Sequence, residues 1–523
     1  MYVPRVSDIQ IGDDTILKPV SRQPVPCHVS EKKYIICESS LDCLFCMWPC
    51  SECSENINEY GIVKRNVGSG LFVKLFCVNG HHVLEWNSQP LLGKMPSCNL
   101  LSAAATLYSG NTYTRISKFA ELLNLQFFSH TVYDEVQTKY LVPVVHDTWV
   151  EEQQRVVQLL KSRENVALIG DGRCDSPGYC AKYCTYSLMH AETELIAGFE
   201  LVQVTETGSS VRMECVGFER CLDSLLDSEV TVTSVATDRH VMVRSLMKKK
   251  YAYMGVEHNF DVYHMANTAR KDVMARSKTR EGKGLEEWLR SILNQLWWSS
   301  RTSGGDPDLL VEKWKSILYH ACNIHEWPDD PEYKIIHKCD HAPLDPHAQR
   351  KKKWIEVDSD LHEALRKVVT KKQFLRDIRM LSRFMHTGAL EVYHALITKY
   401  APKRQHFAYP QMLARTELAA LDHNANVGRC QARVRKPNAQ SAEEGDLKYR
   451  CAFSKQTKQW IAKPIYMDKK YDYIKPMMEA AVQRKLSGEE GPSYSPAVAN
   501  IAPLPAPAKH ELVAKHRTRF GRE

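Results

Sequence analysis

The spacing of apolar and polar residues divides the chain into stretches that predict different structures. Residues 1–100 combine many cysteines with short runs of strand type, such as "LFVKLF". Residues 101–162 predict helices, because Trp149, Val156 and Leu160 recur near the helical period in "LVPVVHDTWVEEQQRVVQLLKSREN". We therefore expect a small β-rich N-terminal domain, followed by a helical region whose apolar positions face a core.

Residues 163–265 change to the pattern of an α/β domain. A buried strand and a Gly/Pro turn are predicted by "NVALIGDGRCDSPG", and two more strands by "GYCAKYCTYSLMH" and "ELIAGFELVQV". Then follow an amphipathic helix ("SVRMECVGFERCLDSLL"), a strand ("VTVTSVATD"), a helix ("HVMVRSLMKKKY") and a strand ("EHNFDVYH"). Three strands, helix, strand, helix and strand is the order of an RNase H-like mixed sheet.

The rest of the chain predicts helices and then loses its periodicity. Residues 266–385 are Trp-rich and predict an all-α insertion, and residues 386–430 predict the last helices of the core. Within these, "HTGALEVYHALITKY" predicts a helix that Thr387 caps. Residues 431–523 are basic and Pro/Ala-rich, so we expect a largely disordered tail.

Three acids are candidates for a catalytic metal site. Asp171 follows the first predicted strand of the sheet and Asp238 follows the fourth. These strands are neighbours in an RNase H-like sheet, so the two carboxylates are expected to converge. Clustered carboxylates resist ionising together, and a cation relieves that repulsion. Mg²⁺ or Mn²⁺ suits such oxygen ligands, and two ions can clamp the oxygens of an in-line phosphoryl displacement.

Glu391 is the candidate for the third acid, because it lies among the apolar residues of the predicted helix in "TGALEVYH". Each of the three acids also has a purely structural interpretation. Asp171 could be a turn residue, with Asp175 as the rival metal ligand, and Asp238 could be a helix N-cap. Glu391 could be a solvated acid that the helix dipole favours.

The cysteines indicate metal sites rather than disulfides. The 17 cysteines are an odd number, and the first residues, "MYVPRVSDIQIGDD", contain no apolar segment of the secretory type. A C-x2-C…C-x3-H pattern predicts a structural zinc site of the ribbon type, with Cys43 and Cys46 as a competing pair. Its ligands are Cys50, Cys53, Cys77 and His81.

A second zinc site is predicted in the helical insertion. The sequences "YHACNIHEW" and "HKCDH" gather nitrogen and sulfur donors at a helix end and in the following loop. Cys322 and His337 compete with the chosen donors, and scattered surface histidines are the plain alternative. The predicted ligands are His320, His325, Cys339 and His341.

The overall charge suits a protein that meets a polyanion on one face. The 523 residues carry a net charge of +8 at an isoelectric point of about 8.6. The basic runs "MKKKY" and "QRKKKW" could contact phosphates or act as nuclear import signals. His264 could touch a substrate phosphate, although a packed histidine is the simpler interpretation. No apolar stretch reaches ~18 residues, so no membrane span is expected.

These motifs, taken together and in order, resemble a family of eukaryotic DDE transposase-like proteins, nearest the Kolobok and Mutator-like cut-and-paste groups. The resemblance runs from about Lys33 to Arg429. It rests on "GDGRCDSPGYCAKYCTY", "TDRHVMVRSLM", "HNFDVYHMA", "NQLWWSS", "KWKSILYHACNIHEW", "HKCDH", "TGALEVYH", "YAPKR" and "LARTELAALDHNANVGR". It implies an RNase H-like core and the triad Asp171, Asp238 and Glu391. Some Kolobok transposases carry a THAP zinc finger, but here the gap between Cys53 and Cys77 is too short to support one.

The resemblance also implies a function. We expect a DDE-type transposase, or a protein derived from one, that cleaves DNA and transfers strands at transposon ends, in the nucleus and as a homo-oligomer on DNA. One alternative is a zinc-containing DNA- or chromatin-binding protein that no longer cuts. Another is a nuclease with the same fold that joins no ends.

Overall fold

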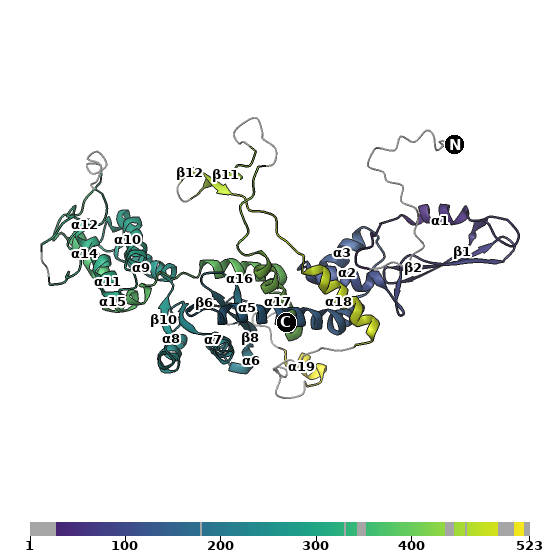
Figure 1. The fold of residues 1–523 in the computed structure, drawn as a ribbon, viewed down its shortest axis with the longest axis horizontal. Coiled ribbons are helices and arrows are strands. Elements are labelled where there is room, and N and C mark those ends of the chain that lie inside the picture. The colour runs from purple at the N-terminus through teal and green to yellow at the C-terminus, as the bar shows by residue number, and fades with distance from the viewer. Residues whose placement is uncertain are drawn as a thin grey trace. The chain divides into compact units, whose positions relative to one another are not determined.

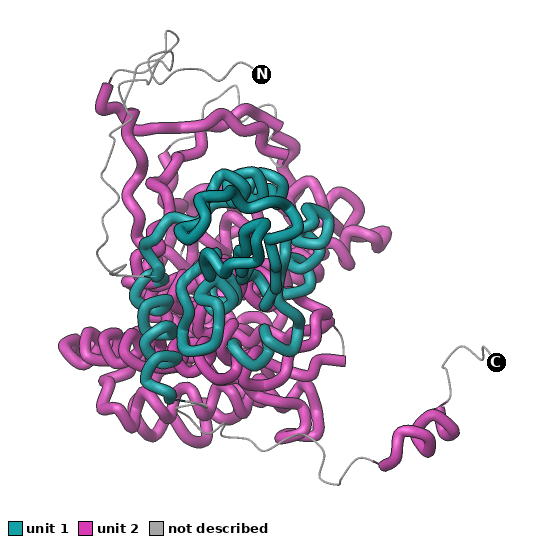
Figure 2. Tube along the Cα trace, turned by 90° about the vertical axis from the view of Figure 1, so that its right-hand side faces the viewer, with its two compact units in different colours: residues 1–105, 113–136, 474–490 teal, residues 106–112, 137–473, 491–523 magenta. Residues whose placement is uncertain are grey.

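The computed structural model forms two compact units (Figure 2). Unit 1 comprises residues 1–105, 113–136 and 474–490, and unit 2 comprises residues 106–112, 137–473 and 491–523. The structure describes residues 28–177, 180–328, 331–342, 352–434, 444–455, 458–489 and 507–516. Part of the basic run "QRKKKW" therefore lies outside the described residues.

Unit 1 contains an antiparallel sheet of three strands, in the order β1-β2-β3. Val73 and Leu75 on β2 are buried and pack with Phe45 of the first helix, because alternate residues of a strand share one face. The β-rich N-terminal region is thus as expected. Its elements are α1 (Glu38–Cys46), β1 (Ile57–Val67), β2 (Gly70–Cys77), β3 (His82–Asn87), β4 (Leu91–Leu92), β5 (Met95–Pro96), α2 (Ser97–Tyr108), α3 (Tyr113–Leu122), α4 (His130–Val136) and α18 (Ile474–Ser487).

Unit 2 is built on a mixed sheet of five strands in the order β10-β9-β6-β7-β8 (Figure 1). β6 pairs antiparallel with β7 and β7 with β8, whereas β6 pairs parallel with β9 and β9 with β10. Three strands, a helical segment, a strand, a helix and a strand follow one another as predicted. The elements are β6 (Val166–Cys174), β7 (Tyr183–His190), β8 (Ile196–Gln203), α6 (Val204–Thr207), α7 (Ser210–Asp227), β9 (Val232–Thr237), α8 (Val241–Lys249), η4 (Tyr251–Met254) and β10 (Glu257–Phe260).

Helices cover both faces of this sheet. Every residue of β7 is buried, which accounts for its nearly continuous apolar sequence. Gly172 on β6 approaches Glu214 of α7, whereas its neighbours Asp171 and Arg173 contact the helix that carries Glu391. Successive residues of a strand point to opposite faces, so α7 covers one face and that helix the other.

The remaining helices of unit 2 fall into two groups along the chain: two helical segments precede β6, and the others follow β10. Trp314 is fully buried among the helices of residues 266–385 and donates its indole N–H to the carbonyl of Val369 at 3.0 Å, so it is a core residue. These helices are η2 (Gln137–Leu141), α5 (Val142–Lys161), α9 (Val262–Arg276), η5 (Leu285–Trp288), α10 (Leu289–Thr302), α11 (Pro307–Lys315), α12 (Ile317–His320), α14 (Asp360–Val369), α15 (Lys372–Ile378), η6 (Arg379–Leu381), α16 (Gly388–Tyr400) and α17 (Tyr409–Asn426).

The C-terminal tail contains more structure than its composition suggests. Strands β11 (Tyr449–Ser454) and β12 (Gln459–Pro464) form a hairpin, α18 belongs to unit 1, and α19 spans Lys509–Lys515. The expectation of a largely disordered tail is therefore wrong for these segments. Within the residues that the structure describes, we find no helical segment with the length and apolarity that crossing a bilayer requires.

Candidate functional site

Asp171 and Asp238 come together just beyond the parallel pairing of β6 with β9. The last paired residues are Ile169 and Ala236, which are 67 positions apart (236 − 169), and the two aspartates are also 67 positions apart (238 − 171). Each aspartate therefore lies two residues beyond the last hydrogen-bonded pair of β6 and β9. Adjacent strands of a sheet are about 4.8 Å apart at such positions. Asp171 and Asp238 thus lie at neighbouring positions of the sheet, and a metal site that they share stays a prediction.

The surroundings of Asp171 differ from the expected strand end. Asp171 lies within β6, which continues to Cys174 and still pairs with β7 at this point, so the prediction that it ends the strand is wrong. Its Oδ1 accepts the backbone N–H of Gly172 at 2.8 Å, and its Oδ2 lies 3.4 Å from Nδ1 of His394 on α16. The carboxylate is thus held between its own strand and a facing helix.

The rival acid, Asp175, has a structural role in the β6–β7 turn. Its Oδ1 accepts the backbone N–H of Lys182 at 3.0 Å, and its own N–H donates to the carbonyl of Tyr183. A carboxylate engaged in closing a turn is less available to a cation. Asp175 thus closes the turn, and Asp171 stays the predicted metal ligand.

Asp238 is not the N-cap of the helix that follows it. The N-cap of α8 is His240, whose ring accepts the N–H of Val243, while Asp238 accepts the N–H of His240 at 3.1 Å. Burial raises the pKa of Asp238 above its ordinary value, and the carboxylate of Asp171 raises it further. The charge of Asp171 thus opposes the ionisation of Asp238, as expected for a neighbouring carboxylate.

Glu214 is a fourth acid that the sequence argument missed. It projects from α7 toward β6, where a Cβ added to Gly172 would lie 2.7 Å from its Cγ. Burial raises the pKa of Glu214 to about 8, and the carboxylates of Asp238 and Asp171 contribute to the shift. Two features of the sequence could have indicated this fourth acid. Gly172, beside Asp171, leaves room for a side chain from a covering helix, and Glu214 lies near the apolar face of the amphipathic helix that follows the third strand.

Glu391 lies in the first turn of α16, exposed to solvent. Its helix is fixed against β6 through His394, three residues later, and residues three apart share a helix face. Glu391 is therefore one turn from the residue that contacts Asp171. Thr387 is at the N-cap position but makes no capping bond, because its hydroxyl instead donates to the buried carboxylate of Asp261 at 2.7 Å.

His264 lies at the same edge of the sheet. Its Nδ1 is 3.8 Å from the Asp261 carboxylate, and its side chain is about a third exposed, at 35%. His264 also opposes the rise in the pKa of Asp238 through its charge. It is therefore a half-buried histidine beside the acids rather than a core residue.

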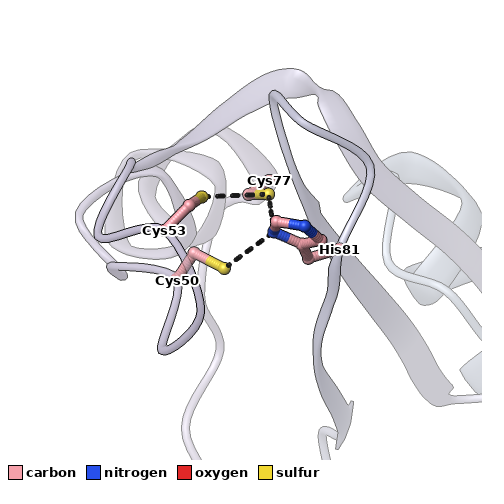
Figure 3. A group of neighbouring side chains, drawn as sticks. All are labelled: Cys50, Cys53, Cys77 and His81. Carbon is pink, nitrogen blue, oxygen red and sulfur yellow. Dashed lines mark hydrogen bonds between the residues drawn. The ribbon is translucent and has the colours of Figure 1, made fainter.

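The first predicted zinc site is assembled in unit 1 (Figure 3). The sulfurs of Cys53 and Cys77 are 3.7 Å apart, and Nδ1 of His81 lies 3.5 Å from the sulfur of Cys77 and 3.7 Å from that of Cys50. Tetrahedral zinc with Zn–S of about 2.3 Å and Zn–N of about 2.0 Å would place such atoms roughly 3.5–3.8 Å apart. The donor set fits zinc.

Two tight turns build this first site. One turn holds Cys50 and Cys53, where the N–H of Ser54 donates to the carbonyl of Cys50 at 2.9 Å. The other follows β2, where Gly80 adopts φ +83° and its N–H donates to the carbonyl of Cys77 at 2.9 Å. The second ring nitrogen of His81 lies 3.7 Å from the carboxylate of Glu52, an arrangement that orients metal-binding histidines.

The second predicted site is assembled in unit 2, and its ligand atoms also lie within 4.8 Å of one another. Nδ1 of His320 lies 3.7 Å from the sulfur of Cys339 and 3.3 Å from Nε2 of His341. His341 directs its other ring nitrogen to a backbone carbonyl at 2.7 Å, and His325 directs Nε2 to Asn323 at 3.1 Å. Such outer contacts fix the ring orientation of metal ligands.

Several details of the second site favour a bound cation. Nδ1 of His325 is buried without a hydrogen-bond partner. Burial lowers the pKa of His320 to about 4, which keeps the imidazole neutral and able to bind metal. The competing Cys322 packs instead against the apolar core of the insertion. Both Cys/His groups could therefore hold a metal such as zinc, with the predicted ligands.

Comparison with known proteins adds little to this geometry. No protein-family model matches the chain, and no curated protein matches it. Among solved structures, the chain has a weak similarity to the Drosophila P element transposase strand transfer complex, with a TM-score of 0.31 and 10% sequence identity. That similarity covers 64% of this chain and 93% of the other. At this level it carries no argument, and the proposals below rest on the residues themselves.

Proposed function

We propose that the chain is a DDE-type transposase, or a protein derived from one, that cleaves and joins DNA with divalent metal. The observation that carries the proposal is the group of half-buried acids Asp171, Asp238 and Glu214 at the sheet. Burial and mutual repulsion raise the pKa values of Asp238 and Glu214 there. Unneutralised clusters of this kind are costly as pure structure and are typical of functional sites.

The proposal includes an RNase H-like fold for the sheet of unit 2. Numbered along the chain, its strands lie in the order five, four, one, two, three, with only the second strand antiparallel to its neighbours. This arrangement supports the proposal, because it brings the first and fourth strands together, with Asp171 and Asp238 at their shared edge.

The donor set suits Mg²⁺ or Mn²⁺, since carboxylate oxygens are the ligands that these ions prefer. Asp171 and Asp238 would hold the metal jointly, and Glu391 would complete the site from α16. When bound, the metal supplies charge that stabilises the attacking and leaving oxygens of a phosphodiester. His394 would orient the Asp171 carboxylate.

The test is cleavage of supercoiled plasmid DNA in Mg²⁺ or Mn²⁺ by the wild-type protein and by Asp238→Asn. We expect nicking by the wild type and its loss in the variant. Asp227→Asn is the matched control, because Asp227 is exposed at the far end of α7. Equal nicking by wild type and Asp238→Asn would refute the proposal.

Product analysis separates the proposal from its nearest alternatives. A transposase joins a DNA end with a free 3′-hydroxyl to the plasmid, whereas a nuclease yields nicks alone. The two Cys/His sites favour a second candidate, a zinc-containing DNA-binding protein that no longer cuts. DNA binding without any metal-dependent nicking would support that candidate. Nuclear localisation and oligomerisation on DNA belong to the transposase proposal.

A further inference from the structure

The hairpin of β11 and β12 is an unusually exposed piece of sheet. Among the described residues it pairs with no third strand, and every residue of β12 is exposed. Antiparallel sheets usually bury one face against a core, and an isolated hairpin is only marginally stable. Both faces of this hairpin are therefore open to a partner.

The base of the hairpin is held by the chain that leaves α17. The N–H of Ala432 donates to the carbonyl of Ile465 at 2.8 Å, and the N–H of Lys448 donates to the carbonyl of Ala432 at 2.7 Å. The N–H of Ile465 in turn donates to the carbonyl of Lys448 at 2.9 Å. These bonds make the hairpin an anchored ribbon rather than a loose loop, and we call residues 447–466 the C-terminal ribbon.

The C-terminal ribbon is cationic throughout. It contains no aspartate or glutamate, and its basic residues are Lys448, Arg450, Lys455, Lys458 and Lys463. Arg450 and Lys463 lie directly opposite each other on the two strands. Like charges in that position destabilise a sheet, and an anion that binds both would remove the penalty.

The other face of the C-terminal ribbon is aromatic. Phe453 and Trp460 are cross-strand partners whose ring centroids are 5.7 Å apart, with an interplanar angle of 72°. Such a pair stabilises the hairpin and holds its twist. Trp460 nevertheless remains 73% exposed. The two faces of the ribbon thus differ. The face with Phe453 and Trp460 stiffens the ribbon, and the face with Arg450 and Lys463 concentrates positive charge.

We propose that the C-terminal ribbon binds double-stranded DNA, with Arg450 and Lys463 on its phosphates. A duplex presents closely spaced phosphates to paired cations, and the major groove of B-form DNA admits a two-stranded ribbon. Double-stranded RNA is a poorer fit, because its major groove is deep and narrow. The inference is independent of the proposed catalysis, since it uses none of the acids at the sheet edge.

The experiment measures binding of the full chain to a labelled duplex of arbitrary sequence over a series of salt concentrations, without divalent metal. Compared with the wild type, Arg450→Gln/Lys463→Gln is expected to bind roughly tenfold more weakly. The slope of log K against log salt should also be smaller in magnitude by about two for this variant. The variant loses two phosphate contacts, and each contact contributes roughly 0.9 to the slope. Lys94→Gln/Lys283→Gln, which changes two exposed lysines elsewhere, is the matched control.

Several outcomes would overturn the proposal. Unchanged affinity and slope in the ribbon variant would do so, as would an equal loss in the control variant. Equal competition by double-stranded RNA would assign the ribbon to RNA. If Trp460→Ser converts a dimer to a monomer while the charge variant binds DNA normally, the ribbon is a contact between copies of the chain. Binding is measured without metal, so failure of the ribbon and failure of catalysis are distinguishable.

Discussion

At the scale of one residue, Glu214 shows how neighbouring carboxylates at the proposed site disfavour the ionisation of a partner on α7. Its carboxyl is partly buried on α7, and burial together with the charges of Asp238 and Asp171 raises its pKa to about 8. At neutral pH the folded chain therefore keeps a proton on Glu214, which an exposed glutamate would have lost. A cation at the aspartates would reverse this preference and draw the proton off.

This proton predicts a pH dependence of stability that Glu214→Gln should weaken. The folded pKa lies above the ordinary value of 4.5, so between about pH 4.5 and about pH 8 the unfolded chain has lost a proton that the folded chain retains. The contribution of Glu214 to the free energy of unfolding therefore falls as pH rises through this window and levels off above it. Denaturant unfolding without divalent metal should show wild type losing roughly 2 kcal/mol more than the variant.

Asp227→Asn serves as the control for this measurement, because it removes an exposed acid from the same helix. It should keep the pH dependence of the wild type. If Glu214→Gln loses as much stability as the wild type between about pH 5 and about pH 8, the carboxyl is not the group that titrates.

The acids also mark how far the sequence could predict the site. Asp171 and Asp238 were chosen because each follows a short apolar run of the sequence, and that signal is local. Glu214 and His394 were not found, since their roles depend on which helix faces β6, which no local pattern encodes. Asp171 lies within its strand because pairing with β7 continues past the point where pairing with β9 stops.

At the scale of elements, the position of α16 depends on a buried contact at its start. The Thr387 hydroxyl donates to the Asp261 carboxylate at 2.7 Å, and the two side chains are 1% and 0% exposed. Asp261 follows β10 and also accepts the N–H of Tyr263 at 2.9 Å. The helix that carries Glu391 and His394 is thereby tied to the end of the sheet where Asp238 lies.

Thr387→Val is expected to weaken the attachment of α16 to the sheet, because it removes the hydrogen bond to Asp261. The variant keeps the shape of the side chain but leaves a buried carboxylate with one hydrogen bond fewer, at a cost of roughly 1–3 kcal/mol in the free energy of unfolding. Plasmid nicking should fall with it, because α16 loses its register against the sheet. Thr387→Ser, which keeps the hydroxyl, should retain most of both properties. Normal nicking by Thr387→Val would show that the contact does not position the helix.

Other elements show why the tail was underestimated. Tyr449, Cys451 and Phe453 recur at every second position, which is the period of a strand. The surrounding Pro/Ala-rich and basic composition outweighed that short signal. α18 is a further case, since it belongs to the unit of residues 1–105 although it follows them by hundreds of positions. The packing of α18 with residues so distant in sequence produces no periodic pattern from which it could be predicted.

At the scale of the whole molecule, the two Cys/His sites belong to different compact units. Cys53 is in unit 1 and His325 is in unit 2. A structural zinc site stabilises the fold around it, with binding free energies on the order of 10 kcal/mol. Loss of one metal should therefore unfold its own surroundings and leave the other unit in place.

Metal analysis of single-ligand variants tests this independence. We expect two zinc ions per chain in the wild type and one in each of Cys53→Ala and His325→Ala. The competing cysteines supply the controls, because Cys43→Ala and Cys322→Ala should keep both ions. Trypsin should open unit 1 in Cys53→Ala and the helical insertion in His325→Ala. Since the acids at the sheet edge lie in unit 2, Cys53→Ala should still nick plasmid DNA, and loss of both ions in either variant would mean that the two sites fold as one.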